Sequence, residues 1–512
     1  MNDSELATAR SAGEAVFFLR SLALQRGGVT RAVLARMRMY AQAGIKVRLL
    51  LTSHGVREMH IQSRIRKQWE LPDSVEIRYF WREAAPGGGG APPDPLVAAR
   101  EEPGFTCFTE QTAKGAVVRC YSDGLLAKSK HLNKKGNPVR IEHHDRARRV
   151  VSREHFDEEG GLVRSEELNP DTGQVTMQRW FDRSGECWLT NWQTEYGSAG
   201  ATVRHRPSAT AYDTYEQCVA EWVDEILAEA ERPVLYSDTR FHDSVLLDMK
   251  HPGARKVAVL HNSHTVKPHR AEDATKGNWL PLLTNLDKID RVVALTHRQR
   301  DDIARRYSGA NVVVINHPTP QAPEVEDEVK REPGLLVTVT RLEPQKRLEH
   351  AIRAFAIASK KVPDARFDIY GTGSEKSKLK ALVGELELTG KVRFAGFTDA
   401  PLAKFAGATA TVLSSWFEGM PLVLNEAMGV GTPFVSYDMN YGPAEVIRHD
   451  VDGLLVPVGD IEALADAMVR VLSDPDYAQR LGKCAREVKE RFSKERWRTE
   501  WIELLERLTE QA

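Results

Sequence analysis

The sequence has few cysteines and no excess of charge. Its 512 residues include five cysteines, which are scattered and form no CxxC pair. An odd, dispersed set of cysteines argues against a disulfide framework or a zinc site. The 71 Lys and Arg nearly cancel the 72 Asp and Glu, so no chain-wide charge points to nucleic acid or to a membrane surface. Any electrostatic preference must therefore be local.

Long hydrophobic runs are also missing. No window approaches about 18 uninterrupted apolar residues, so we expect no transmembrane helix. The short apolar run at residues 15–19 ends at Arg20 and is not typical of a signal peptide. These absences favour a cytoplasmic protein. Because 512 residues exceed what one hydrophobic core fills, two or three domains are expected.

Two parts of the chain alternate apolar strands with helical patterns. The first includes an amphipathic stretch at residues 30–44, and the second starts at residue 335. Such alternation predicts parallel sheets with helices on both faces, and ligands on such sheets bind beyond the carboxyl ends of the strands. The predicted strands are at residues 15–19, 46–51, 75–80, 234–236, 256–260, 291–295, 311–315, 335–339, 367–370, 392–395, 410–413, 433–436 and 454–456.

A different pattern interrupts the first of these parts. Turn signals recur between residues 105 and 192, for example at Asp123-Gly124 and Ser184-Gly185, and predict an antiparallel ladder of hairpins. Residues 86–95 and 318–333 are rich in Pro, Gly or charge and are predicted linkers. The predicted domains are a first lobe at 1–82 and 211–320, a β-domain at 83–210, a second lobe at 321–490 and a C-terminal helix at 491–512 that packs back on the first lobe.

Arg341 and Lys346 follow a predicted buried strand and precede a helical pattern, in the run RLEPQKRLEHAIRAF. Cations at a helix N-terminus oppose the helix dipole, so this placement costs stability unless an anion binds between them. Two solvated surface charges are the alternative reading of this pair alone.

A second segment, Glu418-Gly419-Met420-Pro421-Leu422-Val423-Leu424-Asn425-Glu426, combines a helix start with two carboxylates. Pro421 suits the first helical position, so Leu422 and Val423 would offer unpaired N–H groups to a phosphate. Carboxylates beside a phosphate are explained if they accept hydrogen bonds from hydroxyls. A sugar ring and a ribose would each supply such hydroxyls to Glu418 and Glu426.

Three weaker signals accompany these segments. Gly371 and Gly373 lie in a strand-to-helix loop, Phe397 follows the strand at 392–395, and Gly27-Gly28 opens the helical pattern after the first strand. Glycines let a backbone approach a ligand, but they also serve ordinary turns. Each of these signals alone is compatible with a structural turn, which is the favoured explanation for the segment that holds Phe397.

Together, Arg-x4-Lys, the glycine loop and Glu-x7-Glu resemble the retaining nucleotide-sugar glycosyltransferases of family 4. The resemblance implies an α/β GT-B fold of two Rossmann-like lobes, with the antiparallel β-domain inserted in the first. It implies that Arg341 and Lys346 bind and stabilise the departing diphosphate, that Glu426 holds ribose hydroxyls and that Glu418 holds hydroxyls of the transferred sugar. The substrate would be a UDP-sugar, with no cofactor and no essential metal. The remaining donor-binding residues implied are Gly27, Gly28, Gly371, Gly373, Phe397, Gly419, Met420, Pro421, Leu422 and Val423.

Two histidines, in the run His261-Asn-Ser-His264-Thr265, follow the predicted strand at 256–260. Their spacing resembles the family segment that places a histidine near the donor sugar. We favour His264 as the functional histidine, and His261 stays open. A zinc site is not expected, because no third ligand accompanies them.

The inserted β-domain bears on the acceptor. A family 4 enzyme with such an insert resembles the α-glycosyltransferases of wall teichoic acid, and also those that modify serine-rich adhesins. Teichoic acid is a polyol-phosphate polyanion, and residues 114–154 hold eleven Lys or Arg against four Asp or Glu. This local charge favours an anionic polymer, although the acidic stretch at 157–171 could offset it. The predicted acceptor-binding cations are Lys128, Lys130, Arg146, Arg148 and Arg149.

The resemblance therefore predicts transfer of a hexose, glucose or N-acetylglucosamine, from a UDP-sugar to a polyol-phosphate polymer. The alternatives are transfer to Ser or Thr of an adhesin, and a non-catalytic glycan-binding subunit. Related inserts build oligomers, often trimers, so a homo-oligomer is expected. The protein would be cytoplasmic, with peripheral association to the inner membrane face and no nucleic-acid partner.

Overall fold

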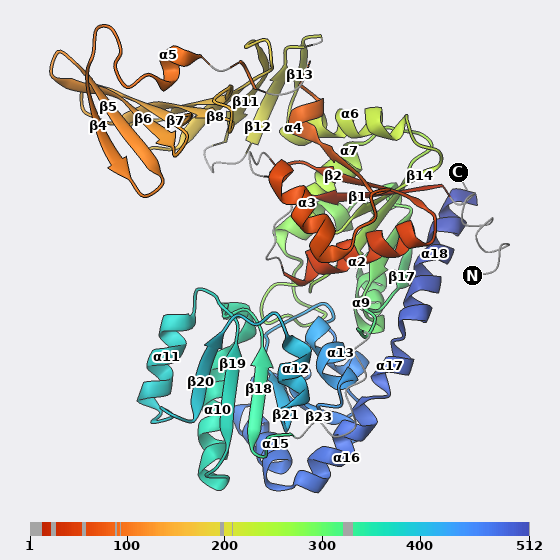
Figure 1. The fold of residues 1–512 in the computed structure, drawn as a ribbon. Coiled ribbons are helices and arrows are strands. Elements are labelled where there is room, and N and C mark those ends of the chain that lie inside the picture. The colour runs from red at the N-terminus through yellow and green to blue at the C-terminus, as the bar shows by residue number, and fades with distance from the viewer. Residues whose placement is uncertain are drawn as a thin grey trace. The chain divides into compact units, whose positions relative to one another are not determined.

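The computed structural model describes residues 13–21, 27–53, 58–85, 87, 90–92, 94–194, 199–206, 208–320 and 331–510. The chain forms two compact units (Figure 1). Unit 1 consists of the described parts of residues 1–25, 40–237 and 241–254, and unit 2 of the described parts of 26–39, 238–240 and 255–512. Arg26 and parts of both predicted linkers, at 86, 88, 89, 93 and 321–330, lie outside the described residues.

Unit 1 contains a parallel sheet in the order β14-β1-β2-β3. All six side chains of β1 are buried, as expected for a strand covered by helices on both faces. The predicted strand at 75–80 ends one residue early, because Phe80 begins a short helix. The elements are β1 (Glu14–Leu19), β2 (Lys46–Leu51), α3 (Glu58–Trp69), β3 (Glu76–Tyr79), α4 (Phe80–Glu83), α5 (Pro95–Ala98), α6 (Tyr215–Leu227), β14 (Pro233–Ser237) and α7 (Asp243–Asp248).

The predicted hairpin ladder is confirmed as one ten-stranded antiparallel sheet, in which consecutive strands are neighbours from β4 to β13. Turns occupy the predicted Asp123-Gly124 and Ser184-Gly185 positions. The strands are β4 (Thr106–Thr112), β5 (Gly115–Ser122), β6 (Leu125–Asn133), β7 (Pro138–His144), β8 (Val150–Phe156), β9 (Leu162–Leu168), β10 (Val175–Phe181), β11 (Cys187–Gln193), β12 (Ala199–Arg204) and β13 (Thr210–Tyr212).

An aromatic cluster joins this sheet to the rest of unit 1. The ring of Phe80 lies 6.0 Å from that of Trp188 and 5.6 Å from that of Tyr215. Next to it, Trp81 stacks on Trp180 with ring centroids 3.6 Å apart. Aromatic residues bury large areas and prefer such stacked and edge-on geometries, so the cluster anchors the inserted sheet on helices α4 and α6.

Unit 2 contains most of α2 and two further sets of parallel strands. The first set has the order β15-β16-β17, and the second is a six-stranded sheet in the order β20-β19-β18-β21-β22-β23. The strands are β15 (Arg255–Leu260), β16 (Arg291–Ala294), β17 (Val312–Val314), β18 (Leu335–Val339), β19 (Arg366–Tyr370), β20 (Val392–Gly396), β21 (Ala410–Leu413), β22 (Phe434–Tyr437) and β23 (Gly453–Val456).

Helices cover the six-stranded sheet and complete unit 2. No helix in the described ranges is long and apolar enough to cross a membrane. The helices are α2 (Gly28–Gln42), η1 (Arg240–His242), η2 (Gly277–Trp279), α8 (Leu280–Leu283), η3 (Leu286–Lys288), α9 (His297–Arg306), η4 (Pro344–Lys346), α10 (Leu348–Lys361), α11 (Lys376–Glu385), α12 (Pro401–Ala406), α13 (Leu422–Gly429), α14 (Pro443–Val446), α15 (Ile461–Ser473), α16 (Pro475–Ala485), α17 (Val488–Arg491) and α18 (Lys494–Glu510).

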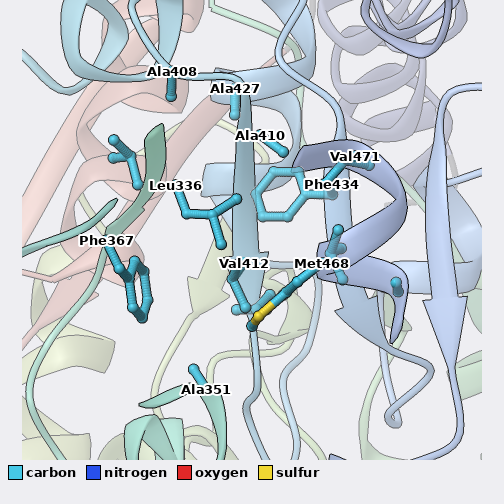
Figure 2. Packing of buried hydrophobic residues seen from close by; sticks show 14 of the residues in the cluster. Leu336, Ala351, Phe367, Ala408, Ala410, Val412, Ala427, Phe434, Met468 and Val471 are labelled. Atoms are coloured by element: carbon cyan, nitrogen blue, oxygen red, sulfur yellow. The ribbon is translucent and has the colours of Figure 1, made fainter. Parts of the chain in front are cut away.

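The core of the six-stranded sheet fixes the ends of its central strands (Figure 2). Leu336 on β18 and Val412 on β21 are buried among side chains of the flanking helices, such as Ala351 of α10 and Met468 of α15. The strand order changes direction between β18 and β21. Loops that leave parallel strands on either side of such a switch point form a crevice that binds ligands.

Candidate functional site

The loops after β18 and β21 carry the two strongest sequence motifs. Arg341 follows β18 and is exposed. Lys346 ends η4, and its Nζ lies 2.5 Å from Oε1 of Glu418 in the loop after β21. Gln345 Nε2 also donates to the carbonyl of Phe417 over 2.9 Å. The structure therefore brings the Arg-x4-Lys and Glu-x7-Glu motifs together at the switch point.

The Lys346–Glu418 pair is largely shielded from water, since the two side chains are 14% and 11% exposed. A charge pair in such surroundings is strengthened by the low local dielectric. Lys346 has three N–H donors, so contact with Glu418 leaves others for a bound anion. The pair therefore combines a cation that can bind a phosphate, Lys346, with a carboxylate that can accept a hydrogen bond from a hydroxyl, Glu418.

The glycines of the loop after β19 have a packing role. A Cβ on Gly371 would lie 1.8 Å from the carbonyl oxygen of Thr340, and one on Gly373 would lie 2.3 Å from that of Leu342. Gly371 also has a φ of +135°, which L side chains rarely adopt. These glycines allow the Thr340–Leu342 backbone, and hence Arg341, to lie against the loop. Their contact with a donor stays a prediction.

The start of α13 corrects one prediction. Pro421 is the N-cap residue, with a ψ of 120°, and Leu422 is the first helical residue. The first turn bond runs from Leu424 N–H to the Pro421 carbonyl. In the described ranges the N–H groups of Leu422 and Val423 have no protein partner, so they remain available to an anion. The predicted phosphate-facing groups are therefore unaffected by the shift of one residue.

Helix α2 places its first turn beside that of α13. A Cβ on Gly28 would lie 3.3 Å from Leu422 Cδ1, whereas one on Gly27 would meet open space. One turn along, Arg31 Nη2 lies 2.7 Å from Glu426 Oε1. Because the two contacts follow in the same order along both helices, the two N-termini lie at the same end. Each carries a partial positive charge, which makes this end of unit 2 suited to an anion.

Arg31 was missed by sequence reasoning. Its signal was present, because a cation in the first turn of α2 opposes the helix dipole as Lys346 does before α10. Glu426 is nearly buried, with 4% of its side chain exposed. The ion pair therefore holds the carboxylate that the family resemblance assigns to a ribose.

Met420 and Gly419 complete the segment before α13. Met420 is buried, and its Sδ accepts from the backbone N–H of His317. A Cβ on Gly419 would lie 2.4 Å from the carbonyl oxygen of His261. This close approach brings the segment after β15 against Glu418–Gly419. The structure therefore places the histidine-bearing segment at the same site.

His261 is held by a hydrogen bond to a buried carboxylate that the sequence did not reveal. Its Nε2 lies 2.7 Å from Oδ1 of Asp238, and Oδ2 of Asp238 lies 2.5 Å from Arg36 Nη2. Burial alone would raise the pKa of the Asp238 carboxyl, but Arg36 and His261 lower it below its usual value. Arg36 also lies 4.2 Å from the Trp501 ring, so α18 packs against α2. His261 therefore has a structural partner that fixes its ring.

His264 is fully buried, and neither ring nitrogen has a hydrogen-bond partner in the described part of the chain. Its ring lies parallel to that of Tyr441 with centroids 6.1 Å apart. Burial lowers the pKa of His264 to about 4, so the ring is neutral at pH 7. An unpaired buried polar group costs about 1–3 kcal/mol, which a ligand hydroxyl would relieve. This favours His264 over His261 as the ligand-facing histidine.

Acidification should destabilise the protein through its buried histidines. Burial lowers the pKa of His264 to about 4 and that of His317 to about 3. Below about pH 6.5 the unfolded chain binds protons that the folded protein does not, so stability falls as the pH drops from about 6.5 towards 4. We expect a lower Tm at pH 5 than at pH 7, and a smaller difference for His264→Gln. If the variant shows the same Tm difference between pH 7 and pH 5, His264 does not contribute to the loss of stability.

The predicted acceptor-binding cations lie in unit 1 and differ in exposure. Arg146, Arg148 and Arg149 are exposed in the turn between β7 and β8, where Arg149 pairs with Asp171 over 2.6 Å. The prediction is wrong for Lys130, which is 1% exposed.

Segment 94–102 explains the burial of Lys130. The Lys130 Nζ is 2.7 Å from Glu102 Oε2 and donates to the carbonyls of Leu96 and Ala99. Lys128 pairs with the same Glu102 carboxylate. The two lysines therefore close this segment over the sheet and are not free for a polymer.

Three further sequence expectations concern exposed or reactive groups. Phe397 is 63% exposed directly after β20, a position from which its ring and backbone are accessible. The five cysteines are free thiols. In the described ranges, no group of three or more His, Cys, Asp or Glu side chains is placed to hold a metal ion.

Residues 321–488 match the family model described as "Glycosyl transferases group 1". The chain is 28% identical over 295 residues to the poly(glycerol-phosphate) alpha-glucosyltransferase of Bacillus subtilis (strain 168), covering 56% of this chain and 43% of the relative. It is 26% identical over 292 residues to the poly(ribitol-phosphate) alpha-N-acetylglucosaminyltransferase of Staphylococcus aureus (strain COL), covering 55% and 57%. The chain thus spans about half the length of these curated relatives.

Solved structures share this fold. A mutant of S. aureus TarM in complex with Fondaparinux, alpha-GlcNAc-glycerol and UDP is similar, with a TM-score of 0.83 at 20% identity, covering 96% of this chain and 99% of that chain. The chain thus has a mixed α/β glycosyltransferase fold that includes an antiparallel sheet. The resemblance predicted from the Arg-x4-Lys and Glu-x7-Glu spacing is confirmed by these relatives.

Proposed function

Because residues 321–488 match the group 1 glycosyl transferases, we propose that this protein is a retaining glycosyltransferase. It moves a hexose, glucose or N-acetylglucosamine, from a UDP-sugar to hydroxyls of a polyol-phosphate polymer of the wall teichoic acid type. The observation that carries the proposal is the meeting of Lys346 with Glu418 beside the paired N-termini of α2 and α13. The polymer is proposed from the curated relatives, whose names specify glycerol-phosphate and ribitol-phosphate acceptors.

The chemistry follows from the charges at this end of unit 2. Transfer breaks the bond between the sugar's anomeric carbon and the diphosphate oxygen, and negative charge develops on the departing diphosphate. Arg341, Lys346 and the free N–H groups at the start of α13 stabilise that charge, and preorganised donors of this kind supply a large part of catalysis. The new bond forms from the acceptor hydroxyl, whose proton passes to the departing phosphate in the front-face mechanism that the family resemblance implies.

Hydroxyl recognition is assigned to the nearby acceptors. Glu418 takes hydroxyls of the transferred sugar, Glu426 takes the ribose hydroxyls and His264 accepts from the sugar. Phe397 and the Gly371–Gly373 loop are assigned to the base and the phosphates of the donor nucleotide. The pairing of Arg31 with Glu426 supports this division, because a carboxylate held by a charge-assisted bond is already oriented for a ribose.

The wider organisation is part of the same proposal. The fold is of GT-B type, with lobes at 1–82 plus 211–320 and at 321–490, and a β-domain at 83–210. The β-domain supports homo-oligomers, and its exposed Arg146, Arg148 and Arg149 attract the anionic polymer. The protein acts in peripheral association with the inner membrane face.

A UDP-release assay tests the proposal. UDP-glucose and UDP-N-acetylglucosamine are each combined with purified glycerol- and ribitol-type teichoic acid. Release that depends on the polymer with one donor confirms the function and identifies the sugar. Slow hydrolysis without polymer stimulation would reject these acceptors, and a Ser-rich adhesin peptide with a candidate partner subunit would then be the next acceptor.

Transfer should persist after metal removal. Positive charge at the diphosphate is supplied by Arg341, Lys346 and two helix N-termini, so a divalent cation is not required for charge stabilisation. We expect UDP release to be unchanged in EDTA. A loss of activity that added Mg²⁺ restores would contradict this expectation.

A further inference from the structure

Lys276 is a half-buried cation without a counter-ion. Its Nζ donates to the Ser263 carbonyl over 2.6 Å and lies 4.0 Å from the centroid of the Phe417 ring. In the described part of the chain, no carboxylate lies within ion-pair distance of it. Burial lowers the pKa of Lys276 to about 8, so the ammonium is still mostly protonated at pH 7. Burying an unpaired charge is costly, which points to an anion that the protein acquires from outside.

This cation lies next to the proposed reaction centre. Phe417 directly precedes Glu418, and the Lys276 backbone N–H donates to the His264 carbonyl over 2.9 Å. Lys276 therefore contacts both segments that carry the proposed sugar-binding groups. Lys346, which is assigned to the diphosphate, contacts Glu418, whereas Lys276 contacts the neighbouring Phe417. The two lysines therefore contact consecutive residues of the same loop.

A second cation without a carboxylate partner in the described residues lies in the loop between Thr265 and Thr275. Lys267 is exposed and its Nζ lies 5.9 Å from the centroid of the Trp416 ring. An antiparallel β-bridge between Thr265 and Thr275 closes this loop. Cations over aromatic rings are held in place without neutralising their charge. Two such ammonium groups therefore flank the Trp416–Phe417 step that leads into Glu418.

The acceptor supplies an anion of the right kind. In a polyol-phosphate, every hydroxyl lies a few bonds from a phosphodiester. When a hydroxyl reaches the sugar bound at Glu418, its neighbouring phosphodiester must lie close to that residue. The donor diphosphate already has Arg341, Lys346 and two helix N-termini. Lys276 and Lys267 are two described cations beside Glu418 that this assignment leaves unused. Arg347, whose guanidinium lies 3.6 Å from the centroid of the Trp416 ring, instead pairs with Glu349.

We propose that Lys276, assisted by Lys267, binds the acceptor phosphodiester adjacent to the attacked hydroxyl and so selects polyol-phosphates over neutral polyols. This inference rests on the proposed function, since it assigns a residue to its acceptor. Lys276 would then position the acceptor and take no part in stabilising the departing diphosphate. A charge-assisted contact of this type adds affinity and orientation.

The test compares Lys276→Gln with Lys276→Arg and with Lys288→Gln, which removes an exposed lysine in η3 of the same unit. Glycerol-phosphate oligomer and free glycerol serve as charged and neutral acceptors. For Lys276→Gln we expect a rise of about tenfold in KM for the oligomer, unchanged transfer to glycerol and an unchanged Kd for UDP. Lys276→Arg should retain most of the preference, and Lys288→Gln should match the unmodified protein.

Direct binding separates failure of this inference from failure of the proposed function. Binding of a fluorescent glycerol-phosphate oligomer is measured in the presence of UDP, with Lys267→Gln as a second variant should Lys276→Gln fold poorly. Absence of any turnover by the unmodified protein would reject the proposed function. An unchanged oligomer Kd and an unchanged oligomer-to-glycerol ratio in the lysine variants would overturn the assignment of Lys276, as would a weakened Kd for UDP alone.

Discussion

Replacing Lys346 with alanine is expected to lower kcat by about a hundred- to a thousandfold, the usual effect of removing one preorganised donor from a developing negative charge. The Lys346 Nζ lies 2.5 Å from Oε1 of Glu418. The substitution therefore removes a phosphate cation and also releases the carboxylate that orients the sugar. Because both effects act on the bonds being made and broken, we expect the loss mainly in kcat, measured by UDP release.

The Lys346 variant should keep its fold at some cost in stability. Glu418 loses its charged partner, although Gln345 Nε2 remains 3.5 Å from its other oxygen. Leaving a mostly buried acceptor without its partner costs about 1–3 kcal/mol, visible as a lower Tm. The matched control is Lys361→Ala in α10, which breaks an exposed pair with Asp466 and should change neither activity nor Tm measurably. Near-normal turnover of the Lys346 variant would refute the diphosphate assignment.

The architecture and the main motifs were predictable from the sequence because they depend on local patterns. Strand-length apolar runs and hairpin turn residues locate the parallel strands and the antiparallel insert. Once the strands are known, the rule for parallel sheets places Arg341 and Glu418 together at the switch point. The Lys346–Glu418 pair follows from that rule, since each residue leaves a central strand on one side of the order change.

The missed residues depend on contacts between distant parts of the chain. Asp238 follows β14, and nothing in its neighbourhood shows that it joins Arg36 of α2 to His261 after β15. Arg31 likewise gains meaning only when Glu426 is found beside it. In the insert, the local excess of basic residues led to the choice of Lys130 as an acceptor-binding cation, but segment 94–102 covers its side chain. Charge along the sequence therefore overestimated the exposed basic surface.

The closeness of Gly419 to His261 ties the two halves of the site into one rigid arrangement. A Cβ on Gly419 would lie 2.4 Å from the His261 carbonyl oxygen and 2.9 Å from the Asn262 backbone nitrogen. Since these neighbours are backbone atoms, no side-chain rotation relieves the clash. The loop that carries Glu418 or the segment that carries His264 must move. Both hold proposed contacts to the transferred sugar, so either movement disturbs the reaction geometry.

Gly419→Ala should therefore lower kcat by about a hundredfold, because misplacing reacting groups by about 1 Å has effects of that size. Overpacking should also destabilise the fold by about 1–3 kcal/mol. Activity is measured by UDP release well below the Tm of the variant, with near-UV circular dichroism to verify that the fold is retained. The matched control is Gly384→Ala in α11, where an added Cβ meets nothing within 4 Å and a helical alanine is more stable than glycine by about 1 kcal/mol. A Gly419 variant that is destabilised but retains normal kcat would show that the close approach serves packing alone, and the His264–Glu418 geometry would then tolerate the shift.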